Sequence, residues 1–160
     1  MLFRSVRVVL NISPFAPVGP DLLDLVDILV VNAHELGGLT GLPPADPTGD
    51  WADVVDATRA ALGESGPSTV VVTLGADGAR TIDLSSGVVS ERIPSPRVKA
   101  VDTTGAGDAF LASLAFRLAH GDDLGDACAF AVRVGAYAAT GEGAQNSYPT
   151  AAQLQGWPPA

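Results

Sequence analysis

The sequence is short of cysteine and of basic residues, and each shortage excludes a class of protein. Its single cysteine, Cys128, rules out an internal disulfide framework and a zinc site built from cysteines. The chain has nine lysines and arginines against 18 aspartates and glutamates. The resulting formal net charge of −9 argues against binding to nucleic acid, whose phosphates need a basic surface. No apolar run approaches the roughly 20 residues that cross a bilayer, so we expect no membrane segment.

The first ten residues lack the pattern of a secretion signal. They contain Arg4 and Arg7 but no continuous apolar segment followed by a cleavage site, so we predict no signal peptide and a cytoplasmic protein. Cys128 stands between Ala127 and Ala129 in a helical pattern. That setting predicts a buried apolar thiol rather than a nucleophile.

Small and apolar residues are abundant instead. Of the 160 residues, 47% are apolar and 18 are glycine, a mixture that suits buried parallel strands covered by helices with small side chains. The length is that of one domain with a core of its own, and we predict a single domain over residues 1–160.

The order of the expected elements indicates an α/β fold. Runs of β-branched residues predict strands at 6–10, 27–32 and 69–73, and a hairpin with arms at 79–84 and 88–93. Helical spacing predicts helices at 21–26 (capped by Asp21), 33–40, 50–63, 107–120 and 122–139, and a short one near 150. Three parallel strands are few for a doubly wound sheet, so we interpret the chain as part of a larger sheet.

The glycine-rich segment from Thr104 to Asp108 follows a valine-rich stretch and opens a long helical pattern. Small residues allow a tight turn that brings several backbone N–H groups to one point at a helix N-terminus, where an oxyanion or phosphate is attracted. Two interpretations fit Asp108. It is either a helix cap behind a flexible loop, or a general base that takes a proton from a substrate hydroxyl. The Gly-Lys-Ser/Thr of a Walker loop does not follow.

Five segments resemble motifs of the ribokinase-like (PfkB) carbohydrate kinase family, in the family's order. The most specific is Asp102-Thr-Thr-Gly-Ala-Gly-Asp-Ala-Phe110. The others are Leu10–Pro14, Asn32–Glu35, Thr73–Gly78 and Gly143–Pro149. The resemblance covers roughly residues 6–155. It implies the C-terminal part of a three-layer α/β/α sandwich with a mostly parallel sheet, whose N-terminal part and lid are missing from this chain.

The resemblance also implies roles for individual residues. Asp108 would be the catalytic base, with an anion hole formed by Gly105, Ala106 and Gly107. The ATP-binding positions would be Asn32 near the triphosphate, Thr73, Gly75 and Gly78 in the nucleotide loop, Gly107, and Val132 near adenine. Many ribokinases have Asn or His near the position of Val132, so we expect a more apolar adenine pocket here.

Two metal ions are implied by the same resemblance. Glu35 would organise Mg²⁺ through water. A K⁺ ion would be held by the side chains of Asp102 and Ser147 and by the carbonyls of Thr104, Ala138, Gly141 and Gly143. Simple structural alternatives stay open: Asn32 as a helix cap, 74–78 as a strand-to-hairpin turn, and 140–143 as a helix-ending loop.

We therefore predict an ATP-dependent carbohydrate kinase, with ribose as the first substrate because Gly143–Ser147 resembles ribokinases in particular. Its partners would be ATP and a small sugar, and it would form a homodimer or associate with a complementing N-terminal half. Two alternatives are a catalytically incompetent nucleotide-binding module and one half of a split kinase. A dehydrogenase-type Rossmann domain fits poorly, because Gly105–Gly107 does not lie between a first strand and helix.

Overall fold

The computed structural model describes residues 6–158. Contacts divide the chain into two compact units. Within the described residues, unit 1 comprises 6–74 and 80–92, and unit 2 comprises 75–79 and 93–158. The first five positions of the segment predicted to lack a secretion signal lie outside the described residues. The single domain over 1–160 stays a prediction.

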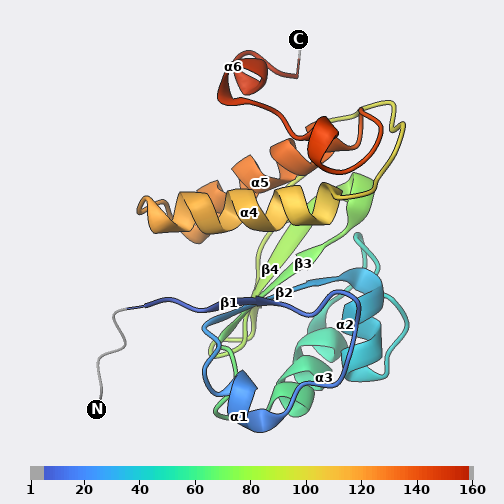
Figure 1. The fold of residues 1–160 in the computed structure, drawn as a ribbon. Coiled ribbons are helices and arrows are strands. Elements are labelled where there is room, and N and C mark those ends of the chain that lie inside the picture. The colour runs from blue at the N-terminus through green and yellow to red at the C-terminus, as the bar shows by residue number, and fades with distance from the viewer. Residues whose placement is uncertain (1–5, 159–160) are drawn as a thin grey trace. The chain divides into compact units, whose positions relative to one another are not determined.

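The described part of unit 1 is built on a mixed sheet of five strands in the order β1-β2-β3-β4-β5 (Figure 1). The strands are β1 (Val9–Asn11), β2 (Ile28–Asn32), β3 (Thr69–Thr73), β4 (Ala79–Asp83) and β5 (Val88–Val89). β2 pairs in parallel with both β1 and β3, whereas β4 and β5 pair antiparallel. The predicted α/β fold, with three parallel strands and an antiparallel addition, is confirmed.

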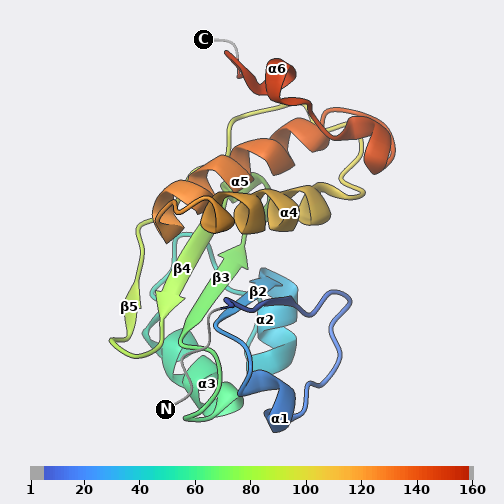
Figure 2. The same cartoon turned by 60° about the vertical axis from the view of Figure 1, so that its left-hand side comes forward.

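The core of unit 1 lies between the sheet and a pair of helices. Helices α2 (Ala33–Thr40) and α3 (Ala52–Leu62) lie side by side against one face of the sheet, and the short α1 (Pro20–Leu23) precedes β2 (Figures 1 and 2). Val70, Val71 and Val72 of β3 are all 0% exposed, as expected for an uninterrupted apolar strand buried on both faces.

Unit 2 is organised around two long antiparallel helices. Helices α4 (Ala106–Ala119) and α5 (Leu124–Ala138) pack against each other along their length (Figure 2). A short α6 (Ala151–Leu154) follows, and the guanidinium of Arg133 on α5 donates to the carbonyls of Leu154 and Trp157. None of the helices in the described part of the chain has the length and apolar character that a membrane crossing requires.

Two predicted strands have different bounds in the structure. The strand predicted at 6–10 begins at Val9, because the N–H of Val8 donates to the side chain of Asp27 at 2.7 Å. The second hairpin arm, predicted at 88–93, is reduced to Val88–Val89. There the Ser90 hydroxyl accepts the Thr81 N–H, which takes this donor away from the backbone ladder.

The first predicted helix also differs. The sequence predicts it over 21–26 with Asp21 as its cap, but it spans Pro20–Leu23 with Gly19 as the N-cap. Pro20 occupies the first helical position, where its fixed φ suits a helix and its missing N–H costs nothing. Asp21 therefore lies inside the first turn.

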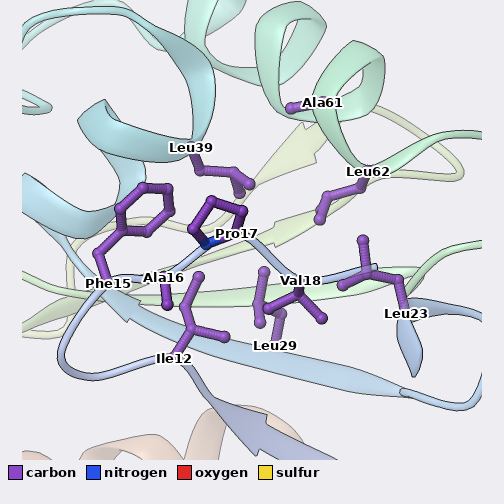
Figure 3. Close-up of a pocket in the computed structure, with 10 residues that line it drawn as sticks. All are labelled: Ile12, Phe15, Ala16, Pro17, Val18, Leu23, Leu29, Leu39, Ala61 and Leu62. Atoms are coloured by element: carbon purple, nitrogen blue, oxygen red, sulfur yellow. The ribbon is translucent and has the colours of Figure 1, made fainter. Parts of the chain in front are cut away.

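An apolar cavity of about 180 Å³ lies in unit 1, and Figure 3 shows the side chains that line it. They come from the segment after β1 and from the neighbouring strand and helices: Ile12, Phe15, Ala16, Pro17, Val18, Leu23, Leu29, Leu39, Ala61 and Leu62. None of these ten side chains carries a hydrogen-bonding group. The cavity therefore does not suit the phosphates of a nucleotide or the hydroxyls of a sugar.

The burial of α5 in unit 2 can be tested through Cys128. It is 0% exposed on α5, and burial raises the pKa of its thiol to about 12. We expect it to stay unmodified by a thiol reagent at pH 8 while the protein is folded, and to react fully in denaturant, because the thiolate is the reactive form. Rapid labelling of the native protein would contradict the burial of α5.

Candidate functional site

The loop before α4 leaves backbone donors free at a helix N-terminus. Gly105 is the N-cap of α4, with a left-handed φ of 77°, and no side chain caps the helix. The N–H of Ala106 donates to Thr103 O at 3.1 Å. Among the described residues, none accepts a hydrogen bond from the N–H of Gly107 or Asp108. Two unpaired donors and the helix dipole thus meet at one point, an arrangement that binds anions.

Asp108 lies in the first turn of α4 with an exposed side chain. The interpretation of Asp108 as the helix cap is therefore wrong, because Gly105 holds that position and turns the chain by its left-handed backbone instead. The carboxylate is left in solvent beside the free amides. It is available for proton transfer.

Asp102 joins this loop to the loop that follows α5. One of its carboxylate oxygens accepts the N–H of Thr104 at 2.9 Å, and the other accepts the N–H of Gly143 at 2.9 Å. The backbone N–H of Val101 also donates to Ala139 O at 2.8 Å. Hydrogen bonds from the side chain and backbone of Thr104, and from the backbone of Gly143, lower the pKa of Asp102.

Of the residues predicted to hold K⁺, Thr104 and Gly143 contact the Asp102 carboxylate through their N–H groups, and Gly141 lies against Ser147. The Ala138 carbonyl at the end of α5 accepts the Gly141 N–H at 3.3 Å, so the chain turns back here, as a helix-ending loop should. A Cβ on Gly141 would lie 3.0 Å from Ser147 Cβ, so a larger residue there would require Ser147 to shift by a few tenths of an ångström. Ser147 is buried, and its hydroxyl donates to Ala144 O at 2.6 Å.

This donor set has the chemistry of a hard-cation site. Carboxylate, hydroxyl and carbonyl oxygens come from Asp102, Ser147 and the loop backbone, without sulfur or nitrogen ligands. Among the described residues, no three His, Cys, Asp or Glu side chains gather into a metal-binding cluster. The oxygen donors of Asp102, Ser147 and the loop backbone are of the kind that fits a monovalent cation.

The predicted nucleotide loop is a tight turn at the end of β3. Thr73 ends β3 in unit 1, and a 3₁₀ turn over Gly75–Asp77 begins unit 2. Gly78 is buried with φ 95°, and a Cβ there would lie 1.9 Å from the carbonyl oxygen of Ile93. Glycine is obligatory at this position for packing alone, so the strand-to-hairpin interpretation of the turn is confirmed.

Asn32 and Glu35 form a capping box at the start of α2 in unit 1. The Asn32 side chain accepts the N–H groups of His34 and Glu35 at 2.9 Å, and the Glu35 carboxylate accepts the Asn32 N–H at 2.8 Å. The alternative interpretation of Asn32 as a helix cap is confirmed. Glu35 is buried at 7% exposure, with one oxygen used by the box.

The surroundings of two positions differ from what the sequence indicates. Val132 is only 5% exposed on α5, so little of its side chain is available to an adenine base. Ala144 and Tyr148, which the sequence singled out only as parts of a motif, lie directly against Gly105. No local pattern signals that contact, because it joins segments about 40 residues apart.

Comparison with known proteins agrees with this geometry. The model of the family described as "pfkB family carbohydrate kinase" matches residues 3–151. This chain belongs to that family. Its members are sugar kinases that transfer a phosphoryl group. Mouse ribokinase is 37% identical over 150 residues, covering 91% of this chain and 44% of the relative. Ribokinase of Schizosaccharomyces pombe is 31% identical over 155 residues, covering 96% and 47%.

Solved structures show the same relationship. A ribokinase of Arabidopsis thaliana, complexed with ribose and ATP, matches with a TM-score of 0.81 and 28% identity over 94% of this chain and 46% of that one. A fructokinase double mutant of Vibrio cholerae, bound to fructose, ADP and potassium, matches with a TM-score of 0.68 and 30% identity over 84% and 41%. The chain thus spans about half the length of these relatives or less, and the prediction of a partial ribokinase-like fold is confirmed.

The two glycines of the nucleotide loop should respond differently to substitution. Gly78→Ala brings a methyl group onto the Ile93 carbonyl, and we expect it to lower the free energy of unfolding by roughly 3–5 kcal/mol. Gly75→Ala is the control, because it has φ 59° and no atom within 4 Å of its Cβ position. It should cost only the left-handed backbone strain, roughly 1 kcal/mol. Equal losses in urea unfolding would contradict the packing role of Gly78.

The two hydrogen bonds that the Asp102 carboxylate accepts should be lost when it is protonated in acid. Since the folded state lowers its pKa from 3.8, its contribution to stability is present above the unfolded pKa and is lost as the pH falls through the folded value. Amide NMR shifts of Thr104 and Gly143 should therefore titrate together, with a midpoint below 3.8. Separate midpoints, or a common one above this value, would mean that the carboxylate does not hold both amides.

Proposed function

We propose that this chain is the ATP-binding and phosphoryl-transfer part of a sugar kinase whose substrate is ribose. The observation that carries the proposal is the start of α4, where the free N–H groups of Gly107 and Asp108 adjoin an exposed carboxylate in a chain of the pfkB family. Amide donors stabilise charge on a phosphoryl group, and a carboxylate accepts a proton, which are the two protein tasks in this reaction.

In the proposed reaction, the Asp108 carboxylate accepts the proton of a sugar hydroxyl. The sugar oxygen forms a bond to the γ-phosphorus of ATP while the bond from that phosphorus to the bridging oxygen breaks, which releases ADP. Backbone N–H groups of the Gly105–Gly107 anion hole lower the energy of the charged transition state. Because the Ala106 N–H is already bonded to Thr103 O, the available donors of the hole are the N–H groups of Gly105 and Gly107, joined by the N–H of Asp108.

ATP would also contact the turn from Thr73 through Gly75 to Gly78, with Asn32 near the triphosphate and Val132 near the base. Mg²⁺, when bound, neutralises charge on the phosphates, and Glu35 would hold its water shell through the oxygen that the capping box leaves free. These assignments rest on the match of each residue to its family motif.

A K⁺ ion would lie in the loop that follows α5. Its ligands would be the side chains of Asp102 and Ser147 and the carbonyls of Thr104, Ala138, Gly141 and Gly143. Two observations support the site: the convergence of Asp102, Gly141, Gly143 and Ser147 in unit 2, and the potassium bound in the Vibrio fructokinase structure. A positive charge there would favour the anion bound at the neighbouring loop.

Ribose is the proposed substrate because ribokinases match nearly the whole chain, and the Arabidopsis ribokinase was solved with ribose and ATP. The named relatives also include a deoxyribokinase of Salmonella typhi, which acts on a related pentose, whereas the fructose in the Vibrio fructokinase structure makes a ketohexose the competing substrate class. A cytoplasmic location and a homodimer remain our proposals on the same basis.

One observation favours a second candidate, a kinase completed by another polypeptide. β1 is an edge strand of the described sheet, and large apolar side chains nearby are exposed: Val6 at 69%, Leu22 at 47% and Leu25 at 52%. An open edge beside apolar surface is suited to pairing with a further strand. In this case the chain alone would bind nucleotide without phosphorylating sugar, and a complementing half would restore turnover.

Asp108→Asn tests the catalytic assignment. With ribose, Mg²⁺ and K⁺, formation of ADP by the chain, alone or combined with the N-terminal half of a ribokinase, should fall on the order of 100- to 10,000-fold, because the substituted amide cannot accept the proton. Asp126→Asn is the matched control, since Asp126 is an exposed first-turn aspartate of α5. Asp126→Asn should leave turnover unchanged.

The outcomes separate the two candidates. Turnover by the chain alone supports a self-sufficient kinase, whereas turnover only after complementation supports a split one. If Asp108→Asn retains full turnover in both settings, the proposed base is wrong. Nucleotide binding by calorimetry without any product in either setting would identify a binding module instead.

A further inference from the structure

The hydroxyl of Tyr148 lies against the glycine that begins the anion-binding loop. A Cβ on Gly105 would lie 2.7 Å from Tyr148 Oη, 2.8 Å from Ala144 Cβ and 3.0 Å from Ala144 Cα. Such separations are shorter than non-bonded contacts allow, so Tyr148 and Ala144 form a wall directly against Gly105. This wall comes from the segment after α5, whereas Gly105 precedes α4.

Local hydrogen bonds fix the chain just before and just after Tyr148. Before it, the 3₁₀ turn Gln145–Ser147 is closed by the backbone N–H and the hydroxyl of Ser147, which donate to Ala144 O at 3.1 and 2.6 Å. After it, Thr150 and Gln153 form a capping box at the start of α6. Tyr148 itself therefore has little freedom to move away from Gly105.

The ring of Tyr148 packs against apolar side chains of both long helices of unit 2 and of α6. It contacts the apolar cluster of unit 2 that contains Ala109 of α4 and Ala138 of α5. Ala109 follows Asp108 directly. The ring therefore packs against a cluster to which the first turn of α4 contributes, while its hydroxyl lies against the N-cap residue of that helix.

We infer that Tyr148 is a positioning residue for phosphoryl transfer. It acts through Gly105: its hydroxyl holds this residue in the left-handed conformation that directs the N–H groups of Gly107 and Asp108 toward the anion. The inference rests on the proposed function and adds to it a residue outside the anion hole. It also explains how the Ser147 turn, where K⁺ would bind, reaches the catalytic loop.

The first test compares two tyrosines of one cluster. Tyr148→Phe removes only the hydroxyl that contacts Gly105, and Tyr137→Phe removes the hydroxyl of a neighbour that packs edge-on against Trp157. In the 160-residue chain, we expect Tyr148→Phe to speed hydrogen exchange roughly three- to tenfold at the bonded amides of Thr104, Ala106 and Ala109. Tyr137→Phe should leave those amides unchanged. Equal exchange in both variants would overturn the inference.

A double-mutant cycle isolates the contact itself. Gly105→Ala should destabilise the chain, and the loss should be smaller when Tyr148 is already phenylalanine. The expected difference is roughly threefold or more in the unfolding equilibrium constant, because the oxygen nearest the new methyl group is gone. Additive effects of Gly105→Ala and Tyr148→Phe would mean that the hydroxyl does not press on Gly105, and the proposal fails.

The functional step is measured with Mg-ATP as the probe. Tyr148→Phe should weaken its binding roughly three- to tenfold at an unchanged urea midpoint, whereas a purely structural role would shift the midpoint and leave affinity intact. Tyr137→Phe should bind as the unsubstituted chain does. If the unsubstituted chain binds no Mg-ATP, the proposed function fails, and the exchange experiment and the cycle still decide whether Tyr148 positions the loop.

Discussion

The arrangement of unit 2 depends on one carboxylate that accepts hydrogen bonds from two loops. Asp102 bonds the N–H of Thr104 with one oxygen and the N–H of Gly143 with the other, each at 2.9 Å. Charge-assisted bonds of this kind are stronger than those between neutral groups. Without them, the turn before α4 and the turn after α5 would be joined mainly by the Gly105 contact and the two backbone bonds to Ala139.

Several residues of the proposed site have a structural role that would select them even without a ligand. The Ile93 carbonyl leaves no room for a side chain at Gly78, and Asn32 and Glu35 together cap α2. Their presence in a family motif is therefore compatible with packing alone. Asp108 differs, because it neither caps α4 nor is buried, and the only structural reason for a carboxylate there is its favourable interaction with the helix dipole in the first turn. It is the residue whose proposed role depends most on chemistry.

Most elements of the fold and the anion-binding turn of the candidate site could be predicted from the sequence, because the signals for them are local. The valines of β3 indicate a buried strand, and Gly105-Ala-Gly before a helical pattern indicates an anion-binding turn. Where predicted element bounds differ from the structure, the causes are also local: the Ser90 hydroxyl shortens the second hairpin arm, and Pro20 moves the start of α1. The wall of Ala144 and Tyr148 against Gly105 could not be predicted, because it depends on how α4 and α5 fold back on each other.

The Asp102–Gly143 bond also constrains how unit 2 can fold. It joins residues 41 positions apart, and closing so long a flexible loop carries an entropic cost that grows with its length. Nearly all of that interval is the α4–α5 hairpin, whose packing brings its two ends together. We therefore expect the helices to pair before the carboxylate bridges the loops, since early bridging would bear the whole loop-closure cost. The proposed anion and cation sites would then be the last part of unit 2 to become ordered and the first to be lost when it opens.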